Sequence, residues 1–172
     1  ASSYSYKLPS ALTGCDDLFV LPHADPTWAT HGNLLNFTAA GGYLWSACHA
    51  VSVLEAIDDP ADVGTAPNLN FLSVTGLVNY GLHSDGTPPY TYLASGDTDP
   101  VMQFIGLLDS GTQSGSERIY LPLSAGWRAT TKAYVYDATQ ADVPGKSPGP
   151  AAVVAIGRAF GNSSYGRVMY EA

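Results

Sequence analysis

Basic residues are scarce in this chain: lysine and arginine together number 7, against 15 aspartates and glutamates, for a formal net charge of -8. The basic residues form no cluster, which argues against nucleic acid as a partner and against a basic membrane-binding patch. No apolar run approaches the roughly 20 residues of a membrane-spanning helix, so we expect no membrane insertion. Charged residues make up only 13% of the 172 residues and hydrophobic ones 45%, which indicates one globular domain.

Cysteine is scarce as well, with only Cys15 and Cys48 in the sequence. Cys15 precedes an apolar run at residues 18–22, whereas Cys48 follows one at residues 43–47. If these runs are parallel strands, the two thiols lie at opposite ends of the sheet, beyond the roughly 4.4–6.8 Å between Cα atoms that a disulfide allows. We therefore expect no disulfide. The four histidines and the paired aspartates lack metal-ligand spacing, and we expect neither a metal nor a cofactor.

Small polar residues and tyrosine are common where basic residues are few, and this composition favours a secreted or cell-surface protein. Two N-glycosylation sequons, Asn36-Phe37-Thr38 and Asn162-Ser163-Ser164, are compatible with that location. We expect Asn36 or Asn162 to carry a glycan.

The first third of the chain alternates between strand and helix patterns. Residues 18–22 and 43–47 are apolar runs of strand length, and a helix is expected over residues 29–40, ended by Gly41-Gly42. A second helix is expected from His49, with apolar residues at helical spacing. This order, with near-continuous apolar strands, predicts a flavodoxin-like three-layer α/β sandwich with a mostly parallel sheet.

The rest of the chain adds one helix start and several strands. Asp99 is a natural N-cap and Pro100 suits the first position of a helix, whose buried stripe comprises Val101, Phe104, Ile105 and Leu108. Strands are expected at residues 118–123, 132–136, 151–157 and 166–170. The last two are joined by a connection too short for a parallel crossover, so we expect an antiparallel closing hairpin.

The strongest candidate for chemistry is Cys48, followed at once by His49. A thiol at a strand-to-helix turn meets free N–H groups, which lower its pKa and stabilise a developing negative charge. His49 is the candidate base, and His23, just past the first strand, is a candidate for the same crevice. Against this, free cysteine is among the most buried residue types, and no acidic partner is identifiable. A surface loop position explains His23 as well.

Two segments resemble a known superfamily. Residues 16–22, then a helix, then Gly-Gly-Tyr-Leu-Trp-Ser-Ala-Cys-His-Ala at residues 41–50 resemble the nucleophile-elbow region of class I glutamine amidotransferase-like domains. The pair Cys48-His49 resembles the Cys-His-Gly of the PfpI type. The pattern of residues 151–171 is similar to the closing hairpin of trehalose-utilisation ThuA-like members.

This resemblance implies a single amidotransferase-like domain over residues 1–172, with Cys48 as nucleophile and His49 beside it. Two departures count against the chemistry. Ala50 replaces the family's glycine, and the late catalytic histidine of the family is missing. The missing histidine, together with the absence of a clear βα unit over residues 1–14, leads us to expect a segment of a larger protein.

Two functions stay open. The first is an extracellular structural or adhesive module within a larger surface assembly, self-associating or binding other surface proteins. It draws on low charge, sequons, glycine-rich loops and tyrosines expected to form a contact surface: Tyr4, Tyr6, Tyr90 and Tyr92. The second is a cysteine hydrolase or amidase of PfpI type that uses Cys48 and His49.

Overall fold

The computed structural model describes residues 3–21, 31–47, 71, 90–93, 96–102, 119–122, 127–137 and 151–171. Within them the strands are β1 (Leu18–Leu21), β2 (Tyr43–Ala47), β3 (Thr91–Tyr92), β4 (Ile119–Pro122), β5 (Lys132–Asp137), β6 (Ala151–Arg158) and β7 (Arg167–Glu171). The helices are α1 (His31–Ala39) and three short 3₁₀ helices, η1 (Pro9–Ala11), η3 (Pro100–Met102) and η4 (Ala159–Gly161).

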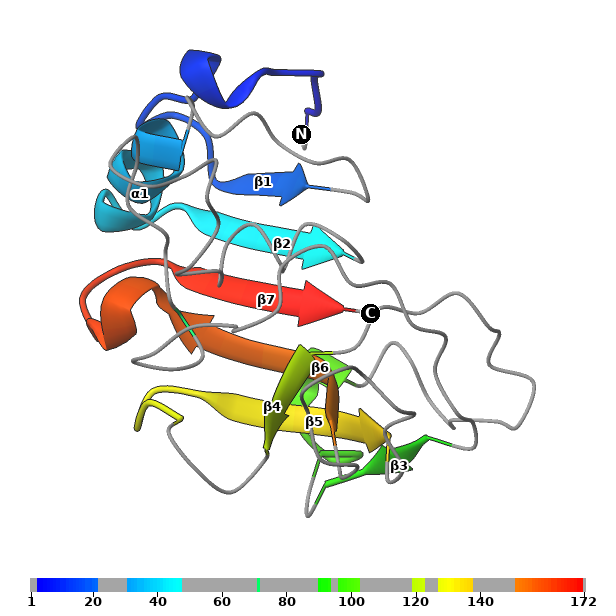
Figure 1. The fold of residues 1–172 in the computed structure, drawn as a ribbon. Helices are drawn as coiled ribbons and strands as arrows, with labels where there is room; N and C mark the ends of the chain where they lie inside the picture. Colours follow the sequence, from blue (N-terminus) through cyan, green and yellow to red (C-terminus); the bar gives the residue numbers. More distant parts are fainter. Residues whose placement is uncertain are drawn as a thin grey trace.

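The described strands form one mixed sheet, so the fold is of the α/β class (Figure 1). Six strands follow the order β1-β2-β7-β6-β5-β3, and β4 pairs with β6 off this path. Strand β2 is parallel to both β1 and β7, and we call these three strands the parallel half of the sheet. Strand β6 is antiparallel to β7, β5 and β4, and β3 is antiparallel to β5. The sheet was expected to be mostly parallel. Among the described strands that expectation is wrong, because two pairings are parallel and four are antiparallel.

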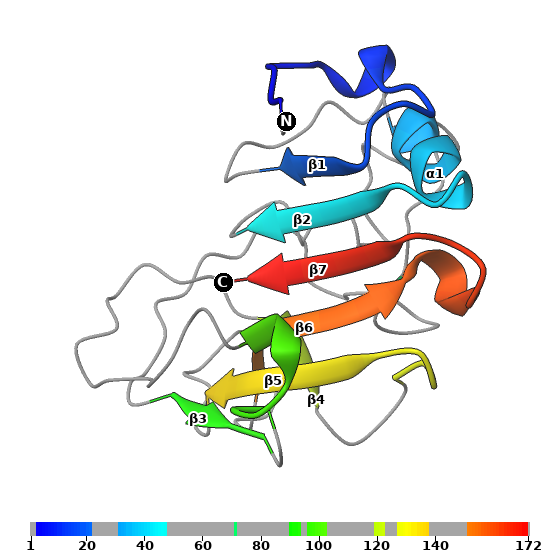
Figure 2. The same ribbon diagram turned by 180° about the vertical axis from the view of Figure 1, so that it is seen from behind.

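The pairing of β1 with β2 is parallel and in register from Leu18↔Tyr43 to Leu21↔Ser46. Between these two strands in the sequence the chain forms α1. Both views show α1 beside the amino-terminal ends of β1 and β2 (Figures 1 and 2). The predicted adjacent parallel strands are confirmed. Residue 22, expected to close the first strand, lies outside the described residues.

Helix α1 ends as its sequence predicts. Gly41 adopts a φ of 97°, a left-handed value that glycine reaches without steric cost. Its N–H donates to the Thr38 carbonyl and the N–H of Gly42 donates to the Phe37 carbonyl, both at 3.0 Å. These two bonds are those of a Schellman motif, and they satisfy carbonyls that the helix leaves unpaired. Residues 29 and 30 of the expected helix are not among those described.

The closing hairpin is antiparallel, with Ile156 opposite Met169 and Arg158 opposite Arg167. That prediction is confirmed. The hairpin turn is fastened to the end of α1, because the Gly166 N–H donates to the Thr38 carbonyl at 2.7 Å. A Cβ on Gly166 would lie only 1.8 Å from the carbonyl oxygen of Gly42. The backbones that enter β2 and β7 are thus in direct contact.

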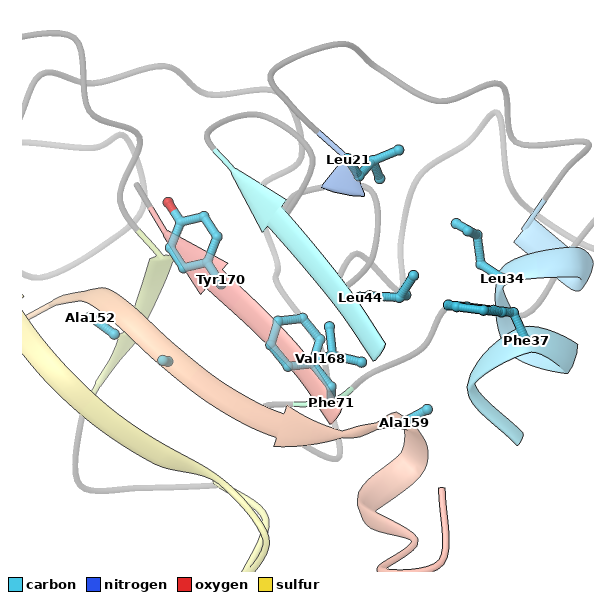
Figure 3. Close-up of a cluster of buried hydrophobic side chains, with 10 residues drawn as sticks. Leu21, Leu34, Phe37, Leu44, Phe71, Ala152, Ala159, Val168 and Tyr170 are labelled. Atoms are coloured by element: carbon cyan, nitrogen blue, oxygen red, sulfur yellow. The ribbon is translucent and has the colours of Figure 1, made fainter. Parts of the chain in front are cut away.

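A first core cluster lies between α1 and the parallel half (Figure 3). Leu34 and Phe37 of α1 point toward Leu44 of β2, and Val168 and Tyr170 extend the cluster along β7. All five side chains are buried. In strands, successive side chains alternate between the two faces, so Leu44, Val168 and Tyr170 define the face of the sheet that α1 covers.

A second core cluster covers the other face of β6 and β7. Met169 belongs to it and lies between Val168 and Tyr170 in the sequence, so it points to the opposite face. Its buried members are Tyr90, Met102, Tyr134, Val135, Val153, Val154 and Ile156. Strand β6 contributes to both clusters and is therefore enclosed on both sides of the sheet.

The predicted N-cap at Asp99 is present. Its Oδ1 accepts a hydrogen bond from the Val101 N–H at 3.0 Å, at the start of the 3₁₀ helix η3. Met102 at the end of η3 is buried in the second cluster. Phe104, Ile105 and Leu108, expected to continue a helical stripe, lie outside the described residues.

Candidate functional site

The structure shows where β1 and β2 end. The predicted catalytic residues follow these two ends in the sequence. Cys48 follows the last residue of β2 directly, and His23 follows the last residue of β1 by two positions. Cys48, His49 and His23 themselves lie outside the described residues. Cys15, which precedes β1, is exposed and has a free thiol.

The three strands of the parallel half end at a common edge of the sheet. In the register of β2 and β7, Ala47 stands beside Glu171, the last residue of β7. The carboxyl ends of parallel strands are where open α/β sheets bind ligands. Glu171 therefore places a carboxylate at this edge, next to the residue that precedes Cys48 in the sequence.

The Glu171 carboxylate is held in place from β2. The indole N–H of Trp45 donates to its Oε2 at 3.0 Å, across the two neighbouring strands. One residue further along β2, the buried Ser46 hydroxyl donates to the Met169 carbonyl at 2.8 Å. An acidic residue beside Ala47, which precedes the candidate nucleophile in the sequence, was missed by the sequence reasoning. Its adjacency depends on the β2–β7 pairing, which links residues 126 positions apart and leaves no local pattern.

A second feature of the parallel half is an apolar surface on the face away from α1. Leu18, Val20 and Tyr43 are 51%, 50% and 48% exposed, respectively. The register places Leu18 beside Tyr43, and Val20 beside the half-buried Trp45. We call Leu18, Val20, Tyr43 and Trp45 the open face. Large apolar side chains that gather at a surface mark interaction sites more often than isolated ones do.

The four tyrosines expected to form a contact surface divide into two pairs. Tyr4 is 95% exposed and Tyr6 is fully exposed, as expected. For Tyr90 the expectation is wrong, because it precedes β3 directly and is buried in the second core cluster. Tyr92 is half-buried against the same cluster, on the strand that pairs with β5. A polar sequence environment did not reveal that pairing.

The two sequons differ in their surroundings. Asn36 is exposed on α1, but the Thr38 of its sequon is buried, with its hydroxyl donating to the Leu35 carbonyl at 2.9 Å. Asn162 is exposed in the hairpin turn, and its Oδ1 accepts hydrogen bonds from the Ser164 N–H and hydroxyl at 3.1 and 2.7 Å. Because glycan acceptors belong to surface loops, Asn162 has the more suitable position.

One cluster of charged groups has a structural explanation. The Lys132 ammonium donates to Asp99 and lies 4.7 Å from the centroid of the Tyr134 ring. The hydrogen bond from Lys132 lowers the pKa of Asp99, with the Val101 N–H acting in the same direction. The same bond raises the pKa of Lys132, while burial raises that of Tyr134. The cluster joins the start of η3 to β5.

Among the described residues, no three His, Cys, Asp or Glu side chains gather as metal ligands would. Within the same part of the chain, no helix is both long enough and apolar enough to cross a membrane. Comparisons of the chain with protein-family models, with curated proteins and with solved structures gave no match.

Proposed function

We propose that this chain is a structural or adhesive module of an extracellular protein, part of a larger surface assembly, built on an amidotransferase-like, flavodoxin-like three-layer fold. The observation that supports it best is the open face. Leu18, Val20 and Tyr43 lie at the end of the described sheet and are each about half exposed. Covering them would remove apolar surface from water, which favours association.

The extracellular setting is supported by the hairpin turn. Asn162 is exposed there, and a bulky glycan on it would project from the end of the β6–β7 hairpin, away from the pairing edge of β1. A glycan at this position leaves the open face accessible. Secretion from a glycosylating host tests this directly, because intact mass falls to that of the bare chain in Asn162→Gln and is unchanged in Asn36→Gln.

Adhesion is tested with beads that carry the purified chain. They are mixed with beads carrying surface proteins of the source organism, and with beads carrying the chain itself. The variant Leu18→Thr/Tyr43→Thr removes apolar area from the open face while keeping residues that suit strands. We expect wild-type beads to clump and the variant beads to stay dispersed.

The matched control is Phe160→Asn. Phe160 is another exposed large apolar residue, but it lies in η4 and has a φ of 52°, which asparagine tolerates. Its beads should clump like wild type. Wild-type beads that bind neither surface proteins nor one another would overturn the proposed function.

The second candidate function is a cysteine hydrolase or amidase that uses Cys48 and His49. The observation in its favour is Glu171, whose carboxylate is fixed by Trp45 beside the last residue of β2. In this proposal Cys48 is the nucleophile, His49 takes its proton, and Glu171 orients the imidazole and stabilises its charged form.

A test of the hydrolase starts from Cys15→Ala, because the exposed Cys15 thiol would otherwise react with every reagent for cysteine. In that background, p-nitrophenyl ester and anilide hydrolysis should vanish on iodoacetamide treatment and in Cys48→Ala. Glu171→Gln should lower kcat by about tenfold or more, as expected for loss of a residue that orients the base. Hydrolysis that survives Cys48→Ala rules the candidate out.

A further inference from the structure

The amino-terminal segment has the pattern of a strand but pairs with no strand in the described part of the chain. In residues 3–8 the large apolar residues Tyr4, Tyr6 and Leu8 alternate with Ser3, Ser5 and Lys7. Such alternation puts all three apolar side chains on one side of an extended chain. All three are exposed, and the two tyrosines make almost no contact with the rest of the chain.

Strand β1 offers the complementary edge. It is the last strand in the described order and has one neighbour, β2. The Asp17 carbonyl accepts a hydrogen bond from the Tyr43 N–H at 2.9 Å, so Asp17 directs its backbone groups toward β2. Backbone groups alternate in direction along a strand, and those of Leu18 and Val20 therefore face away from β2. An outward row of this kind is a template for another strand.

The segment fits this edge in one antiparallel register. Placing Tyr6 opposite Leu18 also places Tyr4 opposite Val20, and both tyrosines then continue the open face. The same register puts Lys7 opposite Asp17, an exposed carboxylate at the start of the edge. Opposite charges facing each other across strands are stabilising, as are aromatic side chains beside β-branched ones.

We propose that residues 3–8 of one copy add to β1 of a second copy as an antiparallel strand. This proposal rests on the proposed function, since it names a second copy as the partner in the assembly and the edge of β1, beside the open face, as the contact. Within their own chain the described residues 3–8 form no strand, and Tyr4 and Tyr6 stay almost fully exposed. The Ala11 N–H donates to the Leu8 carbonyl at 2.8 Å, and Lys7 forms an ion pair with Asp16 that strand addition would exchange for Asp17 of the second copy. In both views the segment lies beyond β1, on the side away from β2 (Figures 1 and 2).

The exchange makes a small interface. Both tyrosines continue the exposed open face, so strand addition covers only part of each, and the total stays below the roughly 1,200–2,000 Å² of a standard stable interface. Main-chain hydrogen bonds along β1 carry much of the association, as in other cases of strand addition. We therefore expect a weak, reversible dimer. Because each copy has a net charge of -8, salt should strengthen the association by screening the repulsion between copies.

The experiment measures the molar mass of the full chain by light scattering over a range of concentrations. We expect a concentration-dependent rise from 18.0 kDa to twice that mass. Val20→Pro removes an outward N–H and should leave the β1–β2 pairing intact, because proline is tolerated on edge strands. Val20→Thr is its control, since it keeps the N–H and the branched shape.

A second variant pair tests the donor. Tyr4→Ser/Tyr6→Ser removes the apolar side of the segment, whereas Ser3→Ala/Ser5→Ala changes its other side. The tyrosine variant should weaken association by about tenfold or more, and the serine variant should behave like wild type. Far-UV circular dichroism checks that every variant is folded.

Mixing is the sharpest step. Val20→Pro retains a donor segment and Tyr4→Ser/Tyr6→Ser retains an acceptor edge, so the mixture can form a dimer through one exchange. The mixture should associate more strongly than either variant alone and less strongly than wild type. A wild-type chain that stays monomeric at every concentration, or a mixture that associates no more strongly than its components, overturns the proposal. The proposed function is judged separately, because beads that bind other surface proteins through the open face uphold it even then.

Discussion

Strands β1 and β6 are both apolar runs, yet they sit in opposite environments. Residues 152–157 of β6 are all buried, whereas in β1 Leu18 and Val20 are exposed and only Leu21 is fully buried. Strand β6 has strand neighbours on both sides and a core cluster on each face. Strand β1 has one described neighbour, and only one of its faces, that of Phe19 and Leu21, packs against a core cluster. An apolar run thus predicts a strand without predicting how many of its faces are covered.

The largest expected effect separates the two faces of the parallel half. Leu44→Ala removes a buried side chain of the first core cluster and should lower the free energy of unfolding by about 2–5 kcal/mol. Leu18→Ala removes the same side chain from the open face, beside Tyr43, and should cost about 1 kcal/mol or less. Urea unfolding of the two variants measures both values. Equal losses would show that the open face is covered in the folded chain.

A second effect concerns the backbone contact that joins β2 to β7. In Gly166→Ala the new Cβ would meet the Gly42 carbonyl oxygen at 1.8 Å, so the turn must move. We expect a loss of about 1–3 kcal/mol, typical of overpacking. Gly14→Ala, in the segment before β1, is the control, because its Cβ would have nothing within 4 Å. Thermal unfolding at equal concentration compares them, and a stable Gly166→Ala would contradict the close approach.

Local features of the fold were predictable from the sequence. The run at residues 43–47 is a strand with those bounds, and Gly41 ends α1 by the expected motif. The closing hairpin is antiparallel because its connection is short. Long-range features were not predictable. The position of Glu171 depends on the β2–β7 pairing, and the burial of Tyr90 depends on β3 pairing with β5. Neither pairing leaves a local pattern.

A smaller effect tests the link between the open face and β7. Trp45→Phe removes the indole N–H that donates to the Glu171 carboxylate. The two side chains of this hydrogen bond are partly buried. We expect a loss of about 1–2 kcal/mol in the free energy of unfolding. Since Trp45 has further interactions, a double-mutant cycle with Glu171→Met isolates the pair, with an expected coupling of about 0.5–1.5 kcal/mol. Additive losses would mean that this bond contributes nothing in solution.

The smallest effect lies where η3 meets β5, outside the parallel half, and depends on pH. Lys132 donates to Asp99 and lowers the pKa of that carboxyl from its ordinary 3.8. A carboxyl with a lowered pKa in the folded state binds its proton more readily in the unfolded chain, so the stabilisation is present above pH 3.8 and is lost as pH falls through the folded-state pKa.

Asp99→Asn retains an oxygen that can accept from the Val101 N–H, so the variant isolates the charge. The difference in unfolding free energy between wild type and Asp99→Asn should be constant from neutral pH to about pH 5 and shrink below about pH 4. In a Lys132→Met background the partner that lowers the pKa most is missing, and the acid-dependent part of the difference should largely disappear. A difference that persists unchanged with Lys132 replaced would show that the ion pair does not join η3 to β5 in solution.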